Sequence, residues 1–544
     1  ETGSITISNP HAGLKLASTN PSISDFTSWG VTPDLKLKPE IAAPGGNIVA
    51  AVLGNTYRSM SGTSMATPQV AGIATLVRQR VNDDPAFAGL SEADKAAIVT
   101  TLMMGTAHPL LDIDQNDGTY YSPRRVGAGQ VDALAATTTT VYPSVAGAEN
   151  PWRPKADLGE GTNGWTFQVT LTNVSDADHT YTLGGQVLSE IVEGGLFTEH
   201  SKNWAGQGID LTYSADSVTV PAKGTTTVTV TVTPRSAFAS YAAENAPKGT
   251  FIDGAVTFTS ADGQPDLTVP YMGFYGSWGA PAVFDGKWYD GTTSTAHACS
   301  STLMNPSTEV PLGALNPLVG QEIDDVRAVD PAYFIMSRSA LPEAPSRILP
   351  RTCLLRNSPK VTYTYTNEAG EVVREYTFER ARKSLFNYHA SKVEPIESQE
   401  GNNPVFDGFD KDGKELPAGR YKLTIDAASV APSSVKSQLT WDFTLDTQAP
   451  VISNLVVTGE GDERVVSFDV TDNSPLAGIA FSESPNSRRY YDEKEAVGAN
   501  RQADGTYAKH YEIKWADLID RADSSDPATA YLFAWDWGKN QARQ

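Results

Sequence analysis

The segment Gly62-Thr63-Ser64-Met65-Ala66-Thr67-Pro68 decides how this chain is interpreted, because it places a serine at the start of a predicted helix. Behind it, apolar residues recur at helical spacing, at Val70, Ile73, Ala74 and Val77. A serine in the first turn of a helix lies close to free backbone N–H groups and to the positive end of the helix dipole. Those groups would stabilise an oxyanion forming at the serine. The plainer alternative is that Thr63 or Ser64 only caps the helix, as Ser and Thr commonly do at such positions.

Two upstream segments make this reading more specific. Phe26-Thr27-Ser28-Trp29-Gly30 comes first, and Lys38-Pro39-Glu40-Ile41-Ala42-Ala43-Pro44-Gly45 follows it before residues 62–68. In this order the three blocks resemble those around the nucleophilic serine of subtilisin-like serine proteases (subtilases). The resemblance implies that residues 23–139 form the C-terminal part of an α/β subtilisin-like catalytic domain, and that Ser64 is its catalytic nucleophile.

The groups that would activate Ser64 are missing from their expected places. A serine hydroxyl needs a base, and the base needs a carboxylate to orient it. In subtilisins the aspartate and the histidine both precede the serine. Here one histidine, His11, precedes Ser64, and it lacks a His-Gly-Thr/Ser context, while the early Asp25 lacks an Asp-Ser/Thr-Gly context. The other histidines lie in loop or sandwich-like sequence, at His108, His179, His200, His297, His389 and His510.

We therefore expect the catalytic aspartate and histidine, together with the oxyanion asparagine, to come from a segment not in this chain. That segment would belong to the same precursor or to an associated chain. On this expectation the present chain is the C-terminal portion of a larger protease and is inactive alone. Residues 1–22 look like the end of an inserted protease-associated domain that returns to the catalytic core.

The hydrophobic period changes from helical to alternating at about residue 140. Trp165, Phe167, Val169 and Leu171 alternate with polar residues, which is the pattern of a half-buried strand. Short alternating strands separated by Gly, Pro and Asp predict antiparallel β-sandwiches. We expect a multidomain chain whose catalytic segment is followed by three fibronectin type III-like sandwiches, at residues 140–279, 280–445 and 446–544.

The first expected sandwich ends with a specific signal. Val269-Pro270-Tyr271-Met272-Gly273-Phe274-Tyr275-Gly276 resembles the end of the fibronectin type III-like domain in cell-envelope proteinases such as lactocepin and the anaphylatoxin-cleaving surface peptidases. Residues 406–421 resemble the second sandwich of the same proteins, with an Asp-rich turn that we expect to shape a hairpin.

The sequence assigns no metal ligand and no cofactor for the chemistry. Residues 112–118 superficially resemble a calcium loop, but the glutamate that closes an EF-hand loop is absent, so we expect a solvated loop there. Relatives can carry an Asn/Asp-rich calcium loop near residues 336–350, and this chain has mainly Ser, Arg, Ala and Pro in that place. A structural calcium ion stays possible, without a position that the sequence can indicate.

Composition narrows the classes of partner and compartment. The chain has 544 residues and a formal net charge of −22, which argues against nucleic acid because phosphate binding needs a basic surface. No run is long enough to span a bilayer. The two cysteines, Cys299 and Cys353, fall in one expected sandwich, where they either pair or are buried as small apolar residues.

Two functions from different classes remain. The first is a secreted, surface-attached serine endopeptidase that cleaves protein or peptide substrates by acyl-enzyme chemistry. The alternative is a non-catalytic adhesion or substrate-recognition array formed by the β-sandwiches from about residue 140 onward. The resemblance around Ser64 favours the protease.

Overall fold

The computed structural model describes residues 22–287, 289–292, 301–314, 329–341, 344–387, 392–396, 403–431, 433–484, 489–495, 499–519 and 530–544. The expected end of an inserted domain, residues 1–22, therefore lies outside the described residues except for Ser22. The chain forms two compact units. Unit 1 consists of residues 1–281 with 431–433, and unit 2 consists of residues 282–430 with 434–544.

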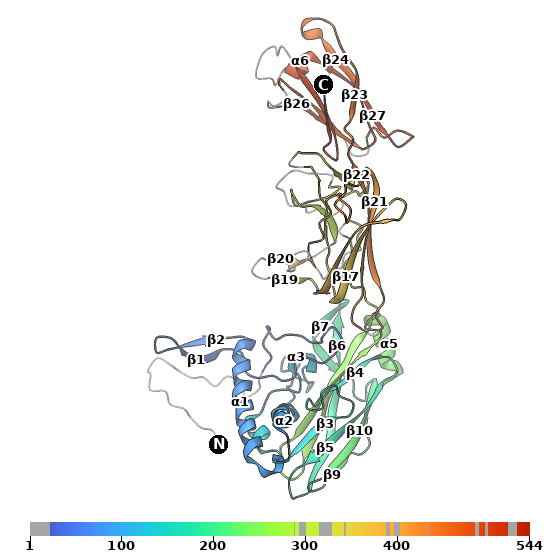
Figure 1. Ribbon diagram of the computed structural model, residues 1–544. Helices are drawn as coiled ribbons and strands as arrows, with labels where there is room; N and C mark the ends of the chain where they lie inside the picture. The colour runs from blue at the N-terminus through green and yellow to red at the C-terminus, as the bar shows by residue number, and fades with distance from the viewer. Residues whose placement is uncertain are drawn as a thin grey trace. The chain divides into compact units, whose positions relative to one another are not determined.

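Unit 1 begins with the segment that contains Ser64, and this segment is mainly helical (Figure 1). The second helix begins as the capping pattern indicates, because the Ser91 hydroxyl accepts a hydrogen bond from the Asp94 N–H at 3.1 Å. Its residues Ile98 and Leu102 are buried against Val77 and Val81 of the first helix. The elements of this segment are β1 (Ile48–Val52), β2 (Thr56–Met60), α1 (Thr63–Asp83), η1 (Pro85–Phe87), α2 (Glu92–Gly105), α3 (Pro123–Val126) and α4 (Ala133–Thr138).

The rest of unit 1 is a pair of β-sheets with one helix, as the alternating pattern predicts. Phe167, Val169 and Leu171 on β5 point into a shared core with Val228 and Val230 on β10. One sheet has the order β3 (Val141–Val145), β5 (Trp165–Asn173), β10 (Thr225–Pro234) and β8 (Ile209–Tyr213). The other has the order β4 (Ala156–Gly161), β12 (Leu267–Tyr275), β11 (Thr250–Ser260), β6 (His179–Glu193) and β7 (Leu196–Asn203), with β9 (Ser217–Val220) beside β6 and α5 (Ser236–Asn245) after β10.

A buried ion-pair cluster joins the helical segment of unit 1 to these sheets. Arg124 on α3 donates from Nε to Asp253 Oδ2 at 2.7 Å, and its Nη2 lies 2.8 Å from Glu190 Oε1. All three residues are less than 10% exposed. The guanidinium also lies 4.1 Å from the centre of the Phe251 ring. Because a buried charge without a partner is costly, this pairing fixes how the two parts of unit 1 pack.

The loop at residues 112–118 is exposed at Asp114 and from Asn116 to Gly118, as expected of a solvated loop, but its start is anchored. Its first residue, Asp112, is only 2% exposed. One carboxylate oxygen accepts from His200 Nδ1 at 2.8 Å and from Gln115 Nε2 at 2.9 Å, and the other accepts from the Asp114 N–H at 3.1 Å. The loop is therefore anchored to β7 by an acid–histidine pair. This pair could not be predicted from local sequence, because His200 is 88 residues away from Asp112.

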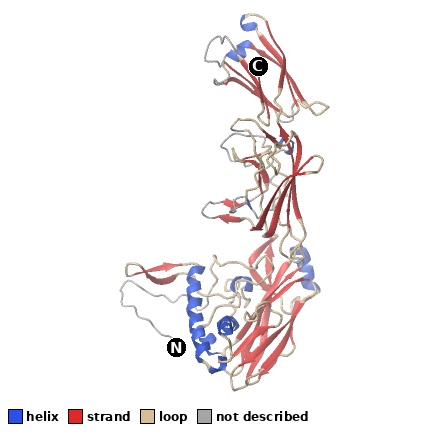
Figure 2. Ribbon diagram, viewed as in Figure 1, coloured by secondary structure: helices blue, strands red, loops and turns tan. Residues whose placement is uncertain are grey.

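Unit 2 contains several further sheets and little helix (Figure 2). Val361, Tyr363 and Tyr365 on β17 are fully buried, as their alternation predicts. One group of strands comprises β13 (Thr302–Asn305), β14 (Val310–Pro311), β15 (Ile335–Ser337), β16 (Leu349–Arg351), β17 (Ser358–Asn367), β18 (Val372–Ala381), β19 (Leu385–Asn387), β20 (Lys392–Glu394), β21 (Gly419–Ala427) and β22 (Ser437–Asp446). Another comprises β23 (Val451–Thr458), β24 (Val465–Asp472), β25 (Leu476–Ser482), β26 (Arg489–Lys494), β27 (Tyr507–Lys514), β28 (Tyr531–Asp536) and β29 (Gln541–Arg543). Short helical elements are η3 (Pro331–Tyr333), η5 (Gly461–Glu463) and α6 (Trp515–Ile519).

The two largest hydrophobic cores among the described residues of unit 2 are separate from each other. The first is built around Tyr365, Phe406 and Trp441, and the second around Phe468 and Ile479. The Asp-rich turn forms the expected hairpin, because the Asp410 carboxylate accepts from the Lys414 N–H at 2.8 Å. Both cores belong to one compact unit, so the expected division into two sandwiches stays a prediction.

The structure also bears on the pairing of the cysteines and on membrane-spanning helices. Cys353 is disulfide-bonded, and the chain's other cysteine, Cys299, lies outside the described residues. Within the described part of the chain, no helix combines the length and the apolar character that crossing a membrane requires.

Candidate active-site segment

Ser64 lies in the first turn of α1 and its side chain is exposed. The residue before the helix is Gly62, whose φ of 156° is one that other residues rarely adopt. No side chain accepts a hydrogen bond from the first turn, so the alternative in which Thr63 or Ser64 caps the helix is wrong. The first N–H groups of a helix have no intrahelical partner. Here the Met65 N–H donates to the Gly62 carbonyl at 3.0 Å, whereas the Ser64 N–H forms no hydrogen bond within the described residues.

The structure brings the three sequence blocks into contact. The Gly62 N–H donates to the Gly45 carbonyl at 2.8 Å, and Gln69 Nε2 donates to the Pro44 carbonyl at 2.7 Å. A Cβ on Gly45 would lie 2.8 Å from the Gly62 oxygen, and one on Gly30 would lie 1.6 Å from the Lys38 oxygen. The second block therefore touches both the first block and the start of α1. Because glycine has no side chain, Gly30 allows the backbone of Lys38 to come close, and Gly45 does the same for the backbone of Gly62.

A fourth segment packs against the second block. Gly127 has a φ of 62°, and a Cβ there would lie 2.2 Å from the Glu40 carbonyl carbon. The Ala42 N–H donates to the Gly129 carbonyl at 2.9 Å, and the Val131 N–H donates to the Ala42 carbonyl at the same distance. The Gly-Ala-Gly run that closes the predicted core is thus in direct contact with the loop that leads to Ser64.

Charged side chains hold the second block in place. Glu40 receives hydrogen bonds from Arg153 Nη1 at 2.6 and 2.8 Å and lies 2.9 Å from Lys38 Nζ and 3.2 Å from Lys155 Nζ. Burial alone would raise the pKa of Glu40, but the hydrogen bond from Lys38 and the charges of Lys155 and Arg153 outweigh it. The pKa of Glu40 therefore lies below its ordinary value, and the carboxylate stays ionised at neutral pH.

The described histidines are occupied elsewhere. Each pairs with an aspartate, and none forms a hydrogen bond with Ser64; the pairs are His108–Asp132, His179–Asp262, His200–Asp112 and His510–Asp469. His11, His297 and His389 lie outside the described residues. Within the part of the chain that the structure describes, Ser64 thus has no imidazole in position to remove its proton.

Two Ser–His–Asp arrangements do occur among the described residues. Ser467, His510 and Asp469 form one on β24 and β27 of unit 2, where all three side chains lie on the exposed side of the sheet. The other, at Ser175, lies in the β-sheets of unit 1. Ser175 Oγ lies 3.0 Å from His179 Nε2, and His179 Nδ1 lies 3.0 Å from Asp262 Oδ2. The Ser175 hydroxyl also lies 2.8 Å from Asn173 Oδ1 and 3.0 Å from the Ala177 carbonyl. A hydroxyl has one hydrogen, so these acceptors compete for it. The group stabilises the turn between β5 and β6, and it lacks the helix N-terminus that Ser64 has.

Several apolar side chains on α1 and on the β1–β2 hairpin are exposed within the described chain. Leu76 on α1 is 52% exposed, and the β1–β2 hairpin exposes Leu53 by 98% and Tyr57 by 74%. A Cβ built on Gly72 of α1 would meet nothing within 4 Å. One face of α1 and the neighbouring hairpin are therefore uncovered, which is unusual for the middle of a 21-residue helix with an apolar stripe.

Comparisons with known proteins identify the two kinds of domain. A model of the subtilase family matches residues 3–129, and a model of an Fn3-like domain matches residues 157–272. These matches support a subtilase region followed by an Fn3-like domain. The further division of residues 280–544 into separate domains stays a prediction.

Several bacterial proteinases are similar to the chain over most of its length. It is 28% identical to a PII-type proteinase of Lactococcus lactis subsp. cremoris over 86% of this chain and 24% of that protein. It is 25% identical to a C5a peptidase of Streptococcus pyogenes over 81% of this chain and 41% of that protein. A tandem repeat of a large adhesion protein aligns at 13% identity, over 70% of this chain and 69% of that one, with a TM-score of 0.19. A TM-score this low does not indicate a shared fold.

The chain spans about a quarter of the length of the first relative and about two fifths of the second. It contains the three sequence blocks of the subtilase pattern in the expected order, and the second block contacts the other two. The Fn3-like domain follows them. The chain therefore carries a segment of the subtilase family joined to an Fn3-like domain, and it is homologous to subtilisin-like proteinases.

Proposed function

We propose that this chain is the C-terminal portion of an extracellular subtilisin-like serine endopeptidase, with Ser64 as its nucleophile. The observation that carries the proposal is the exposed Ser64 hydroxyl in an uncapped first turn of α1, in contact with the other blocks of the subtilase pattern. An exposed hydroxyl beside unoccupied N–H groups is what attack on a carbonyl requires.

In the proposed reaction, Ser64 Oγ attacks the scissile carbonyl of a protein or peptide substrate. A histidine from another polypeptide segment removes the hydroxyl proton and later donates it to the leaving amine, while an aspartate orients that histidine. The Ser64 N–H shares the oxyanion with an asparagine from the same segment. Water then hydrolyses the acyl-enzyme, so the substrate gains a water and Ser64 is restored. No cofactor takes part in these steps.

The uncovered apolar surface supports a docking place for that segment. Leu76 is exposed on the second half of α1, and Leu53 and Tyr57 are exposed on the β1–β2 hairpin that precedes the helix. Small or absent side chains at Ala71 and Gly72 would permit close approach of another element along the same helix. We infer that the segment comes from the same precursor or from a chain that stays bound, and that this chain alone does not hydrolyse peptides.

The proposed location is outside the cell, at its surface. Homology to the proteinases described above supports it, as does the disulfide-bonded Cys353, because disulfides persist in oxidising compartments. Neither nucleic acid nor a membrane span has a place in the proposal.

The decisive experiment compares the full-length precursor carrying Ser64→Ala with one carrying Ser59→Ala. Ser59 is an exposed serine on the preceding strand β2, so its replacement by alanine also removes one serine hydroxyl. Cleavage of a fluorescein-labelled denatured protein should fall by about 10⁴-fold or more in the first variant and stay unchanged in the second. A fluorophosphonate probe should label Ser64 in the precursor. Full cleavage by Ser64→Ala would exclude the proposal.

A second experiment tests the docking surface. Leu76→Asp should weaken association with the upstream segment by about 100-fold or more, because a buried leucine is lost and a charge is desolvated. Leu134→Asp is the matched control, since Leu134 is 73% exposed on α4. Association is measured by co-purification of separately expressed segments. Equal losses in both variants would indicate general destabilisation instead of a specific contact.

A further inference from the structure

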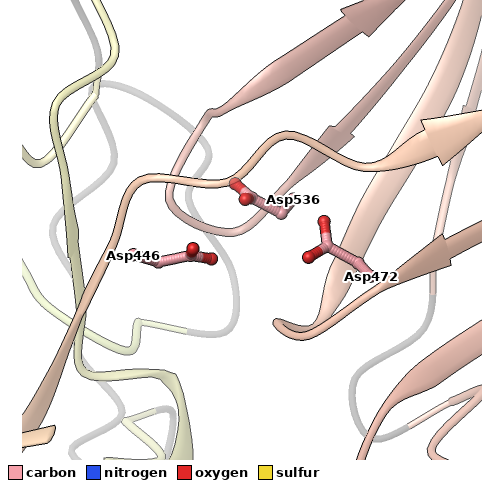
Figure 3. A group of neighbouring side chains, drawn as sticks. All are labelled: Asp446, Asp472 and Asp536. Carbon is pink, nitrogen blue, oxygen red and sulfur yellow. The ribbon is translucent and has the colours of Figure 1, made fainter. Parts of the chain in front are cut away.

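Three aspartates converge in unit 2 from the ends of three strands. Asp446 ends β22, Asp472 ends β24 and Asp536 ends β28. One carboxylate oxygen of each lies within 4.8 Å of the others. Figure 3 shows the three carboxylates facing one another across a small space. The strands belong to three different sheets, so the cluster lies where these sheets meet.

The three carboxylates are buried and carry no compensating charge. Asp446, Asp472 and Asp536 are 1%, 8% and 0% exposed. Within the described residues, none of them forms an ion pair with Lys, Arg or His, although other buried acids in this chain do. Three carboxylates gathered in this way repel one another and have lost their hydration.

Burial and mutual repulsion raise the pKa of two of these carboxyl groups. Burial, and then the neighbouring carboxylates, raise the pKa of Asp536 to about 8. Burial and the charge of Asp446 likewise raise the pKa of Asp472 to about 6.

In Asp446 and in Asp472, one carboxylate oxygen accepts hydrogen bonds and the other accepts none. Asp446 Oδ1 accepts from the Gln448 N–H at 3.0 Å and from Asn473 Nδ2 at 3.3 Å, and Asp472 Oδ1 accepts from the Ser474 N–H at 3.0 Å. Oδ2 of each is buried and accepts no hydrogen bond. Both side chains are thus oriented through one oxygen, and the other oxygen is buried without a hydrogen-bond partner.

The third acid is fixed by a tight turn. Asp536 Oδ1 accepts from the Asn540 N–H at 2.9 Å, and Oδ2 accepts from Asn540 Nδ2 at 2.9 Å. Asn540 Nδ2 also lies 3.3 Å from the Asp446 carbonyl, so it links the turn to the end of β22. Ser337, the register partner of Asp446, donates its hydroxyl hydrogen to the Gly538 carbonyl of the same turn. The arrangement is therefore rigid before any ion binds.

We propose that Asp446, Asp472 and Asp536 bind one Ca²⁺ ion, which links the ends of β22, β24 and β28. Only oxygen ligands are present, which suits a hard cation. Two ligands on opposite sides of Ca²⁺ lie about 4.8 Å apart, so the three oxygens can share one ion. The open Oδ2 atoms of Asp446 and Asp472 would be direct ligands, and water would complete the coordination. Asn540 is a positioning residue, because it acts through Asp536.

The experiment titrates the whole chain, first stripped with EDTA, with Ca²⁺ and with Tb³⁺ as a luminescent substitute. Trp535 and Trp537 flank Asp536 in the sequence and would sensitise Tb³⁺ bound there. The wild type should take up one ion at this site, gain several degrees in Tm with Ca²⁺, and show Tb³⁺ emission that Ca²⁺ displaces. Asp472→Asn should bind one ion fewer and lose both responses.

The matched control is Asp442→Asn, which makes the same change on the same strand as Asp446, at a side chain that is 81% exposed. It should respond to Ca²⁺ like the wild type. If Asp472→Asn does not fold, Asp446→Asn replaces it. A wild type that binds no Ca²⁺ at millimolar concentration would overturn the proposal, whatever the variants do. So would an unchanged ion count and Tm response in the folded variants, because the carboxylates would then be only a proton-sharing cluster.

Discussion

Two buried clusters of charge, one in each unit, are built on opposite plans. In unit 1, Arg124 lies between Asp253 and Glu190 and donates hydrogen bonds to both. In unit 2, Asp446, Asp472 and Asp536 face one another with no cation among the described side chains. The first cluster carries its counter-charge in the sequence. The second is complete only when a cation comes from solution.

The two plans have different consequences for stability. A buried ion pair that loses one partner leaves the other charge desolvated, which costs about 3 to 5 kcal/mol. A buried group of like charges is already in that unfavourable state, so removal of one charge relieves it. The same kind of substitution should therefore have opposite signs in the two units when Ca²⁺ is absent.

The largest effect is expected for Arg124→Met in unit 1. Asp253 and Glu190 would remain buried without a counter-charge, so the free energy of unfolding should fall by about 3 to 5 kcal/mol. Arg235→Met is the control, because the Arg235–Asp210 pair is largely exposed and should contribute less than about 1 kcal/mol. Chemical denaturation followed by the fluorescence of unit 1 measures both. Equal decreases in the free energy of unfolding would show that the buried ion pair contributes no more to stability than the exposed one.

A smaller effect of opposite sign is expected for Asp472→Asn in unit 2 in the presence of EDTA. At pH 7.5 the substitution removes a buried negative charge next to Asp446 and Asp536, so the free energy of unfolding should rise by about 1 to 2 kcal/mol. Calcium should stabilise the wild type and leave the variant unchanged. A variant that is less stable than the ion-free wild type would show that Asp472 is held by interactions that favour its charge.

The smallest effect concerns the acid that anchors the loop at residues 112–118. Burial alone would raise the pKa of Asp112, but hydrogen bonds from His200 and Gln115 outweigh it, so the pKa of Asp112 lies below its ordinary value. A folded-state pKa below the unfolded value gives stability that is present above the unfolded pKa and is lost as the pH falls through the folded pKa. Asp112→Asn should cost about 1 kcal/mol at pH 7 and reduce the loss of stability below about pH 4.

The control for that prediction is Asp114→Asn, an exposed acid in the same loop. It should leave both the stability at pH 7 and its acid dependence as they are in the wild type. Urea denaturation at several pH values from 2.5 to about 7 separates the two variants. A parallel acid dependence in the wild type and in Asp112→Asn would mean that His200 contributes nothing through this carboxylate.

Much of the fold could be predicted because it depends on local patterns. The apolar spacing after Ser64 predicts α1, the Ser91 capping pattern predicts the start of α2, and the alternation from Trp165 predicts β5. These signals lie within single elements, where a residue's neighbours in sequence are also its neighbours in space. The candidate nucleophile was predicted in the same way, from contiguous blocks, and its catalytic role stays a prediction.

The acidic cluster and the Arg124 cluster were not predicted, because their members are far apart in the sequence. Asp446, Asp472 and Asp536 each look like an ordinary strand-end or turn residue. A signal was nevertheless present, since an amide residue follows each aspartate within four positions, at Gln448, Asn473 and Asn540. The side-chain amides of Asn473 and Asn540 donate to Asp446 and Asp536, while Gln448 donates only through its backbone N–H. These residues do not reveal which carboxylates meet.

The sequence alone determined the elements, the order of the subtilase and Fn3-like parts, and the serine that stands at the start of α1. These follow from short-range periodicity and from contiguous motifs. Only the tertiary structure decided which charges are buried together, because burial and electrostatic partnership depend on contacts between strands that are dozens of residues apart. For that reason the helix beneath Ser64 could be expected, whereas a cation site formed by three strand ends became visible only in the folded chain.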